Sequence, residues 1–221
     1  SVENETDVTV IIAYAQSFKY FAGIPRDVMR RRLRMIEEYE DIARTMLVDP
    51  KWIQAAEHVL CVHLRRGDYV RSLLHAHSTA TFAIPALRLV LRRIREQRQM
   101  VGVQIVLFSD DTEWASTHIA KKHRMFSVAR LNTTGYHVPP EVDWEFSRQY
   151  CDSVLLTASA STFGWLLAYN AKGDDVYYNT VASKPGGFQA TFNPNDFFPS
   201  EWTPLEYDTS TGEVGVRPPR V

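Results

Sequence analysis

The chain has 221 residues, of which 45% are hydrophobic, 12% aromatic and 23% charged, a composition typical of a folded globular domain that excludes a disordered chain. Its 25 lysines and arginines nearly balance 26 acidic residues, and the resulting formal charge of −1 argues against a dedicated nucleic-acid binder. No apolar run approaches the roughly 20 residues that cross a bilayer, so we expect any membrane attachment to come from a segment outside this chain.

Residues 1–58 differ in pattern from the rest of the chain and are predicted to form an apolar segment followed by a helix. An apolar stretch spans Val8–Tyr14, and a helix is expected from Pro25 to Leu47. One face of that helix carries the apolar residues Met29, Leu33, Ile36, Ala43 and Leu47. We interpret its arginines as a solvated face, with an anion site as the alternative: Arg26, Arg30, Arg31, Arg32 and Arg34.

Residues 59–207 alternate short apolar runs with helical patterns, which predicts an α/β fold with a Rossmann-like parallel sheet. The expected strands are Val59–Leu64, Val103–Phe108, Met125–Ala129, Val154–Thr157 and Asp175–Tyr178. The expected helices are Phe82–Gln99, a short helix ending near His123, Val142–Tyr150 and Thr162–Ala171. Residues 208–221, rich in Gly, Pro, Ser and Thr, are expected to form a flexible tail.

Several chemistries find no support in the residue pattern. The two cysteines, Cys61 and Cys151, exclude a four-thiolate zinc site, and we interpret them as buried thiols. His75 and His77 lack a third metal ligand at a useful spacing. The Gly-x-Ser-x-Gly elbow of serine hydrolases and the Gly-x-Gly-x-x-Gly dinucleotide fingerprint are both absent.

Residues 63–69 read His-Leu-Arg-Arg-Gly-Asp-Tyr and follow a buried strand. Ligands of open parallel sheets bind at the carboxyl ends of the strands. Arg65 and Arg66 therefore predict an anion site, because a guanidinium group clamps phosphate oxygens in a bidentate manner. A salt bridge to Asp68 that closes a surface turn is the alternative interpretation.

Polar residues also follow two other predicted strands. Asp110 and Asp111 could bind a sugar or a base, or Asp110 with Glu113 could cap the next helix. Residues 157–161 form a loop of small and hydroxyl residues before a helix, an arrangement that cradles phosphate. Ser161 as an ordinary helix N-cap is the alternative.

These segments carry a resemblance to a known family. His-Leu-Arg-Arg-Gly-Asp-Tyr resembles the His-x-Arg-Arg-x-Asp motif shared by α1,2- and α1,6-fucosyltransferases. Residues 159–169 resemble the Ser-x-Ser-Thr-Phe-Gly-Trp-Trp pattern of the α1,2 group, glycosyltransferase family 11, with Leu166 in place of the second Trp. Phe-Ser-Asp-Asp and Gln-Ser-Phe-Lys-Tyr-Phe are weaker landmarks, so the resemblance covers nearly the whole chain. The family's Gly-Asn-x-x-Phe-x-x-Ala segment has no match, and we therefore expect a partial chain. The resemblance implies that residues 1–58 are the end of the N-terminal, acceptor-side domain with a connecting helix.

The resemblance implies a GT-B-like enzyme with two Rossmann-like domains, no cofactor and no metal requirement, which binds GDP-fucose in the C-terminal domain. It implies that Arg65 binds the β-phosphate and that His63, Arg66 and Asp68 shape the same pocket. The remaining residues that it carries over are Ser161 and Thr162 on the phosphate side, and Asp110 or Asp152 at the guanosine.

The implied reaction transfers L-fucose from GDP-β-L-fucose to a galactose 2-hydroxyl with inversion, and Arg65 would stabilise the departing diphosphate. Asp68 and His77 are candidates for the general base by residue type alone. The alternatives are a truncated, inactive GDP-sugar-binding module, an α1,6- or protein O-fucosyltransferase, and a structural domain whose Arg-Asp turn is a salt bridge.

The resemblance also implies a place in the cell and a partner. Such enzymes are typically Golgi membrane proteins with a signal anchor and a lumenal catalytic domain, and they act on glycan acceptors. Asn4 and Asn132 each begin an Asn-x-Thr sequon, so a lumenal chain is expected to be a glycoprotein.

Overall fold

The structure is a computed structural model that describes residues 17–45, 56–99, 102–121, 128–129, 139–188 and 192–218. The predicted Val8–Tyr14 stretch and both sequons lie outside these residues. The helices in chain order are η1 (Phe18–Tyr20), α1 (Arg26–Arg32), α2 (Glu37–Thr45), α4 (Gly67–Arg71), α5 (Ala80–Arg98), α6 (Thr112–Trp114), the π-helix η2 (Ala115–Ala120), α7 (Pro140–Tyr150), α8 (Thr162–Tyr169) and α9 (Pro194–Phe197). The strands are β1 (His58–Leu64), β2 (Val103–Ser109), β3 (Val128–Ala129), β4 (Ser153–Leu156), β5 (Asp175–Asn179), β6 (Thr203–Asp208) and β7 (Glu213–Val216).

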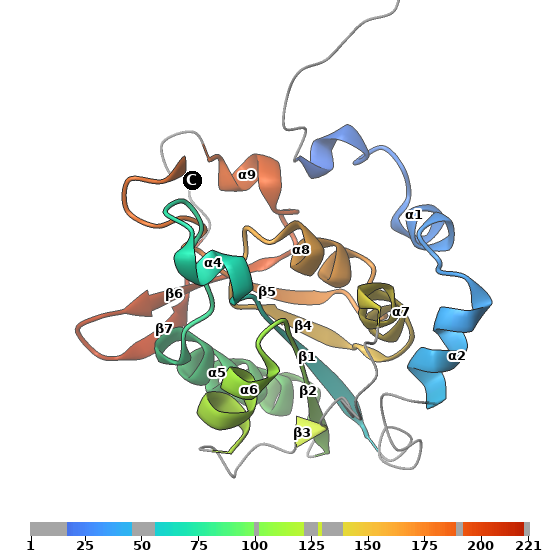
Figure 1. Cartoon of the computed structure of the whole chain (residues 1–221), viewed down its shortest axis with the longest axis horizontal. Helices are drawn as coiled ribbons and strands as arrows, with labels where there is room; N and C mark the ends of the chain where they lie inside the picture. Colours follow the sequence, from blue (N-terminus) through green and yellow to red (C-terminus); the bar gives the residue numbers. More distant parts are fainter. Residues whose placement is uncertain are drawn as a thin grey trace, which may run out of the picture.

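The strands form one sheet in the order β3-β2-β1-β4-β5-β6-β7 (Figure 1). All neighbouring pairs are parallel except β6 and β7. From β1 the chain proceeds outward through β2 and β3, and from β4 it proceeds the other way. This order confirms the predicted α/β, Rossmann-like parallel sheet and places its topological switch between β1 and β4.

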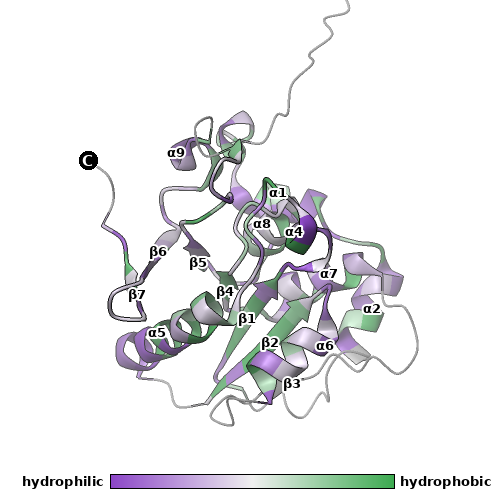
Figure 2. Ribbon diagram, turned by 60° about the vertical axis from the view of Figure 1, so that its left-hand side comes forward, coloured by the Kyte–Doolittle hydropathy of each residue, from purple (hydrophilic) through white to green (hydrophobic). Residues whose placement is uncertain are grey.

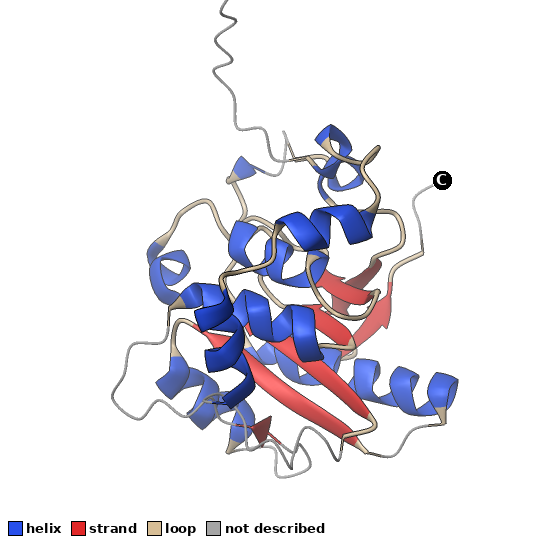
Figure 3. Ribbon diagram, turned by 90° about the vertical axis from the view of Figure 1, so that its right-hand side faces the viewer, coloured by secondary structure: helices blue, strands red, loops and turns tan. Residues whose placement is uncertain are grey.

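Helices cover both faces of the sheet (Figure 3). Alternate residues of β1 face opposite sides: Leu60, Val62 and Leu64 belong to the core under α5, whereas Val59 and Cys61 belong to the core under α7 and α8. α5 carries both apolar and polar residues (Figure 2), and all seven residues of β1 are buried, including His58 and His63. This is the pattern expected of a central strand in a sheet that is covered on both faces.

The predicted single helix from Pro25 to Leu47 is wrong, because the segment contains two helices, α1 and α2, separated at Leu33–Ile36. α2 packs against α7. α1 instead lies at the C-terminal end of α8, where Arg26 donates hydrogen bonds to the carbonyl oxygens of Tyr169 (3.0 Å), Ala171 (3.2 Å) and Gly173 (3.0 Å). One straight helix could not reach both surfaces.

The interpretation of the helix arginines as a solvated face is also wrong for two of them. Arg26 caps the end of α8 as described, and Arg30 donates to the carbonyl oxygens of Lys172 (3.3 Å) and Arg148 (3.2 Å). Helix C-termini leave carbonyl groups without partners inside the helix, and cationic side chains are stabilising there. These two arginines therefore anchor the N-terminal arm, which we define as residues 17–34.

The C-terminal segment corrects two further predictions. The sheet has two strands more than the five predicted, β6 and β7, and β7 lies inside the expected flexible tail. Asp208 accepts hydrogen bonds from the backbone and hydroxyl of Ser210, and Gly212 adopts a φ of +73°. These turn residues join β6 to β7 as an antiparallel hairpin.

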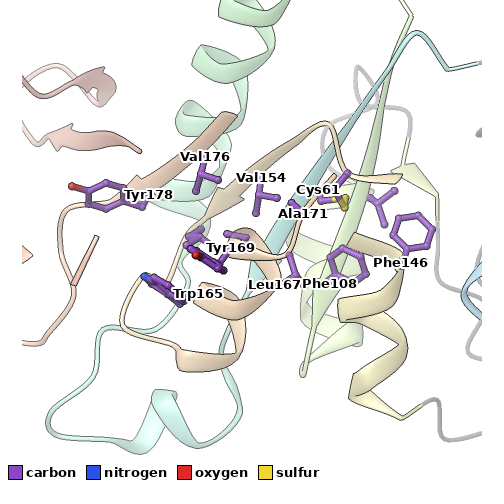
Figure 4. Close-up of a cluster of buried hydrophobic side chains, with 14 of the residues drawn as sticks. Cys61, Phe108, Phe146, Val154, Trp165, Leu167, Tyr169, Ala171, Val176 and Tyr178 are labelled. Carbon is purple, nitrogen blue, oxygen red and sulfur yellow. A yellow bond between two sulfur atoms is a disulfide. The ribbon is translucent and has the colours of Figure 1, made fainter. Parts of the chain in front are cut away.

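The two cysteines form a buried disulfide between β1 and the residue after α7, with the Cα atoms of Cys61 and Cys151 5.6 Å apart (Figure 4). The prediction of separate thiols was wrong, because the fold brings together two cysteines that lie 90 residues apart in sequence.

Within the described residues, no helix is both long enough and apolar enough to cross a membrane.

Candidate functional site

The carboxyl ends of β1 and β4 meet at the topological switch of the sheet, and a chain of hydrogen bonds joins the loops that follow them. Thr157 Oγ1 donates to the carbonyl oxygen of His63 (2.8 Å) and lies 2.6 Å from Ser78 Oγ, which accepts from the backbone N–H of Arg65 (2.9 Å). The structure therefore fixes the start of the 65–69 segment against the β4–α8 turn, where ligands of such sheets bind.

Arg65 is held by two carboxylates and an aromatic ring. Its Nη2 lies 2.8 Å from Asp68 Oδ1, and its Nη1 lies 2.9 Å from Asp110 Oδ2. The guanidinium carbon is 5.3 Å from the centre of the Tyr69 ring. The side chain remains 32% exposed, so a positioned guanidinium group faces solvent at the switch point.

Arg66 is tied to its surroundings more fully. Its Nε donates to Asp111 (3.1 Å), its Nη1 donates to the carbonyl oxygen of Ser78 (2.8 Å), and its guanidinium lies 3.9 Å from the centre of the Trp114 ring. Only 14% of the side chain is exposed. Arg66 therefore braces the loop, and Arg65 is the arginine of the pair that is available to a ligand.

The two aspartates after β2 have different roles. Asp111 is the N-cap of α6 and accepts from the backbone N–H of Trp114 (3.1 Å), so the predicted cap at Asp110 is wrong by one residue. Asp110 instead accepts from the backbone N–H of Arg66 (2.8 Å) and pairs with Arg65. A side chain at Gly67 would collide with the Asp110 carboxylate and displace it from this position.

The β4–α8 turn presents the start of a helix to the same site. Ser161 is the N-cap of α8, and its hydroxyl accepts from the backbone N–H of Gly164 (3.3 Å). Thr162, the first helical residue, is exposed. Tyr69 Oη donates to the carbonyl oxygen of Ala160 (3.4 Å), which ties this turn to the Arg65 segment. The structure thus brings Ser161 and Thr162 to the same sheet edge as Arg65.

His63 lies beneath this surface rather than on it. The residue is 4% exposed, and a side chain at Gly164 would collide with its ring. Burial, and secondarily the charge of Arg65, lowers the pKa of His63 to about 3. The imidazole is therefore neutral at physiological pH and supports the loop from below.

Asp152 is the predicted site residue that the structure separates from the others. It precedes β4, accepts from the backbone N–H of Val59 near the start of β1 (2.9 Å), and pairs with Lys172 (2.8 Å). β1 is seven residues long, so Asp152 lies about 20 Å from Arg65, at the amino ends of the strands. This position does not support a guanosine contact.

His77 lies in the loop before α5, on the Ser78 side of the site. Its Nδ1 is buried and has no hydrogen-bond partner among the described residues. Burial lowers the pKa of His77, and the charges of Lys184 and Arg66 lower it further. The ring is therefore neutral at physiological pH, the form in which an imidazole accepts a proton.

Asp143 is a titratable residue that the sequence pattern did not single out. It lies in the first turns of α7, next to Trp144, whose indole donates to the carbonyl oxygen of Phe163 (3.1 Å) in the first turn of α8. Burial raises the pKa of Asp143 to about 7. No sequence signal marks it, because its burial depends on how α7 packs.

Comparison with known proteins places these residues in a family. The sequence matches glycosyl transferase family 11 over residues 7–206. A galactoside 2-alpha-L-fucosyltransferase of Caenorhabditis elegans is 31% identical over 226 residues, which cover 93% of this chain and 55% of that protein. A second protein of the same name and organism is 32% identical over 193 residues, covering 87% of this chain and 51% of that protein. The chain therefore spans about half the length of these curated relatives.

A solved structure of POFUT1 in complex with GDP aligns with 65% of this chain and 46% of its own, at 12% identity and a TM-score of 0.41. That similarity is too low to support a conclusion. The family match is different, because it covers most of the chain. The chain belongs to glycosyl transferase family 11.

Proposed function

We propose that this chain is the donor-binding part of a galactoside α1,2-fucosyltransferase and binds GDP-β-L-fucose at the carboxyl ends of β1 and β4. The observation that carries the proposal is Arg65, a positioned and partly exposed guanidinium at the switch point of the sheet, beside the N-terminus of α8. The names of the two curated relatives support the choice of donor and acceptor.

The diphosphate would bind between Arg65 and the first turn of α8. The carboxylate of Asp68 is 70% exposed and occupies Nη2 of Arg65, so a phosphate oxygen can replace it. Two arginines and three aspartates, Asp68, Asp110 and Asp111, give this cluster a formal charge of −1. The site therefore selects an anion through directed donors, namely the guanidinium fork and the N–H groups at the start of α8, rather than through an overall positive field.

The proposed reaction breaks the bond between C1 of fucose and the β-phosphate oxygen, and the bonding electrons leave with GDP. The acceptor 2-oxygen forms the new bond to C1 on the opposite face, and its proton passes to a base. Arg65 would stabilise the charge that develops on the diphosphate. Asp68 and His77 are the two candidates for the base. The neutral His77 ring has the protonation state that this role needs.

Three further features belong to the same proposal. A GT-B arrangement would pair the described Rossmann-like sheet with a second domain that contributes the acceptor site. No metal or cofactor would be needed, because Arg65 and the α8 N-terminus supply positive charge. A Golgi lumenal location, with the protein held by a signal anchor, fits the Cys61–Cys151 disulfide, since such bonds persist in oxidising compartments.

The donor site can be tested by calorimetric titration of the chain with GDP-β-L-fucose and with GDP in EDTA. We expect Arg65→Ala to weaken both affinities by about tenfold or more, the usual effect of losing a charged hydrogen bond. Arg92→Ala, at an exposed position on α5, is the matched control and should bind like the wild type. Equal affinity of wild type and Arg65→Ala, with both chains folded, contradicts the assignment of Arg65.

A non-catalytic nucleotide-sugar-binding module is the second candidate, because the chain spans about half the length of its relatives. Binding of GDP-fucose without any transfer to a galactoside acceptor would favour this module. Measurable transfer by the same preparation would exclude it.

A further inference from the structure

A second feature of the candidate site is an apolar cavity between the N-terminal arm, α8 and α9. Its walls include Phe18 and Phe21 of the arm, Thr162, Trp165 and Leu166 of α8, and Phe197 of α9. Neither the Arg65 cluster nor the family match accounts for this cavity.

The polar groups of the cavity walls are mostly engaged elsewhere. The indole nitrogen of Trp165 donates to the carbonyl oxygen of Phe197 (2.9 Å), and the Ser17 hydroxyl donates to the carbonyl oxygen of Asp196 (2.6 Å). The Phe21 and Trp165 rings pack edge to face with centres 5.8 Å apart, which holds the arm against α8. The cavity is therefore a formed pocket that presents rings and methyl groups.

The cavity adjoins the proposed phosphate site through Thr162, which lines it and is also the first residue of α8. The sugar of a nucleotide sugar is bonded directly to the β-phosphate. If the diphosphate binds at the first turn of α8, the sugar must lie next to that turn, of which Thr162 forms part of the cavity wall. This step rests on the proposed donor site.

The chemistry of the walls distinguishes one class of sugar from another. A hexose carries a hydroxymethyl group on C5, and its hydroxyl must lose water and find a new partner when it is buried. A 6-deoxyhexose carries a methyl group at the same place, which gains from burial against apolar rings. An aromatic and aliphatic pocket beside a sugar-phosphate site therefore fits the deoxy sugar.

We propose that this cavity receives the C6 methyl group and the adjoining carbon face of a 6-deoxyhexosyl donor, and that Phe18 and Leu166 help to set this specificity. Both side chains are half-buried in the cavity wall, one from the arm and one from α8. The arm would then take part in recognition of the donor sugar.

The test uses two donors that differ by one hydroxyl group, GDP-β-L-fucose and GDP-β-L-galactose, with GDP as the reference ligand. We expect the intact chain to bind the fucose donor about 10- to 100-fold more tightly, the range in which apolar pockets discriminate against an added hydroxyl. Leu166→Asn should reduce that ratio several-fold and leave the affinity for GDP unchanged. Leu89→Asn, a half-buried leucine of α5 on the other face of the sheet, should change neither value.

A second variant, Phe18→Ser, tests the same wall from the arm if Leu166→Asn does not fold. Equal binding of the two donors by the wild type would overturn the cavity assignment while leaving the GDP site in place. A ratio that neither variant changes would also overturn it. If the folded wild type bound none of the three ligands, the result would instead count against the proposed donor site itself.

Discussion

At the scale of single residues, the carboxyl group of Asp143 predicts how the stability of the chain depends on pH. Because burial raises its folded-state pKa to about 7, above the ordinary value near 3.9, the folded chain holds this proton more tightly than the unfolded chain does. Its contribution to stability is present in full below about pH 4 and is lost as pH rises to about 7. Asp143→Asn should therefore stabilise the chain relative to wild type at pH 8 more than at pH 5.

Urea unfolding of the wild type and Asp143→Asn at these two pH values measures the effect. Glu141→Gln, which changes a carboxylate two residues earlier in the same helix, serves as the control, because it removes a negative charge from α7 and leaves Asp143 in place. A stability difference that is the same at pH 5 and pH 8 would show that Asp143 ionises normally in the folded chain.

At the same scale, the sequence predicted well which residues lie at the site, but it predicted less well which contacts each of them makes. Arg65, Asp68 and Ser161 could be placed because each follows a recognisable apolar strand, and strand ends converge in a parallel sheet. The exchange of roles between Asp110 and Asp111 could not be predicted, since it depends on the direction in which each side chain leaves the loop. The burial of His63 under Gly164 depends on the position of α8, a contact across about a hundred residues.

At the scale of elements, the Cys61–Cys151 disulfide ties the central strand to the end of α7. Both residues are 0% exposed, and the bond closes a loop that contains α5, β2 and α7. We expect the Cys61→Ala/Cys151→Ala variant to lose about 2–5 kcal/mol of unfolding free energy. Urea titration with and without dithiothreitol measures this loss, and only the wild type should respond to the reductant. A wild type as stable with dithiothreitol as without it would show that the fold does not depend on an oxidising compartment.

Helices and strands were predicted correctly where a local residue pattern specifies them. The prediction failed where contacts with residues distant in sequence determine the element. The apolar runs of β1, β2 and β4 mark central strands without further information. β6 was missed because it contains Pro204 and has little alternation, and it is specified by pairing with β5. The break between α1 and α2 likewise follows from contacts with α8 and α7, which no periodicity within residues 25–47 contains.

At the scale of the whole molecule, the β6–β7 hairpin extends the sheet, and β7 packs against α5. Val214 on β7 is 5% exposed in the core under α5, whereas Val216 on the same strand is 41% exposed. Val214→Ser should cost about 1–3 kcal/mol of unfolding free energy, and Val216→Ser should cost less than about 0.5 kcal/mol. Denaturant unfolding of the two variants measures both losses of unfolding free energy. Equal losses would show that the Val214 side chain is not buried against α5.

The N-terminal arm contacts α8 at both of its ends. Phe18 lines the same cavity as Thr162 of the first turn, and Arg26 binds the carbonyl groups at and beyond the last turn. The helix whose N-terminus we propose as part of the donor site is thus held at both ends by a segment that precedes the sheet in sequence. By linkage, a ligand that draws on both the helix and the arm tightens the attachment of the arm, and whatever detaches the arm weakens the ligand by the same factor. If the proposed donor draws on both, the arm and the donor act as effectors of each other.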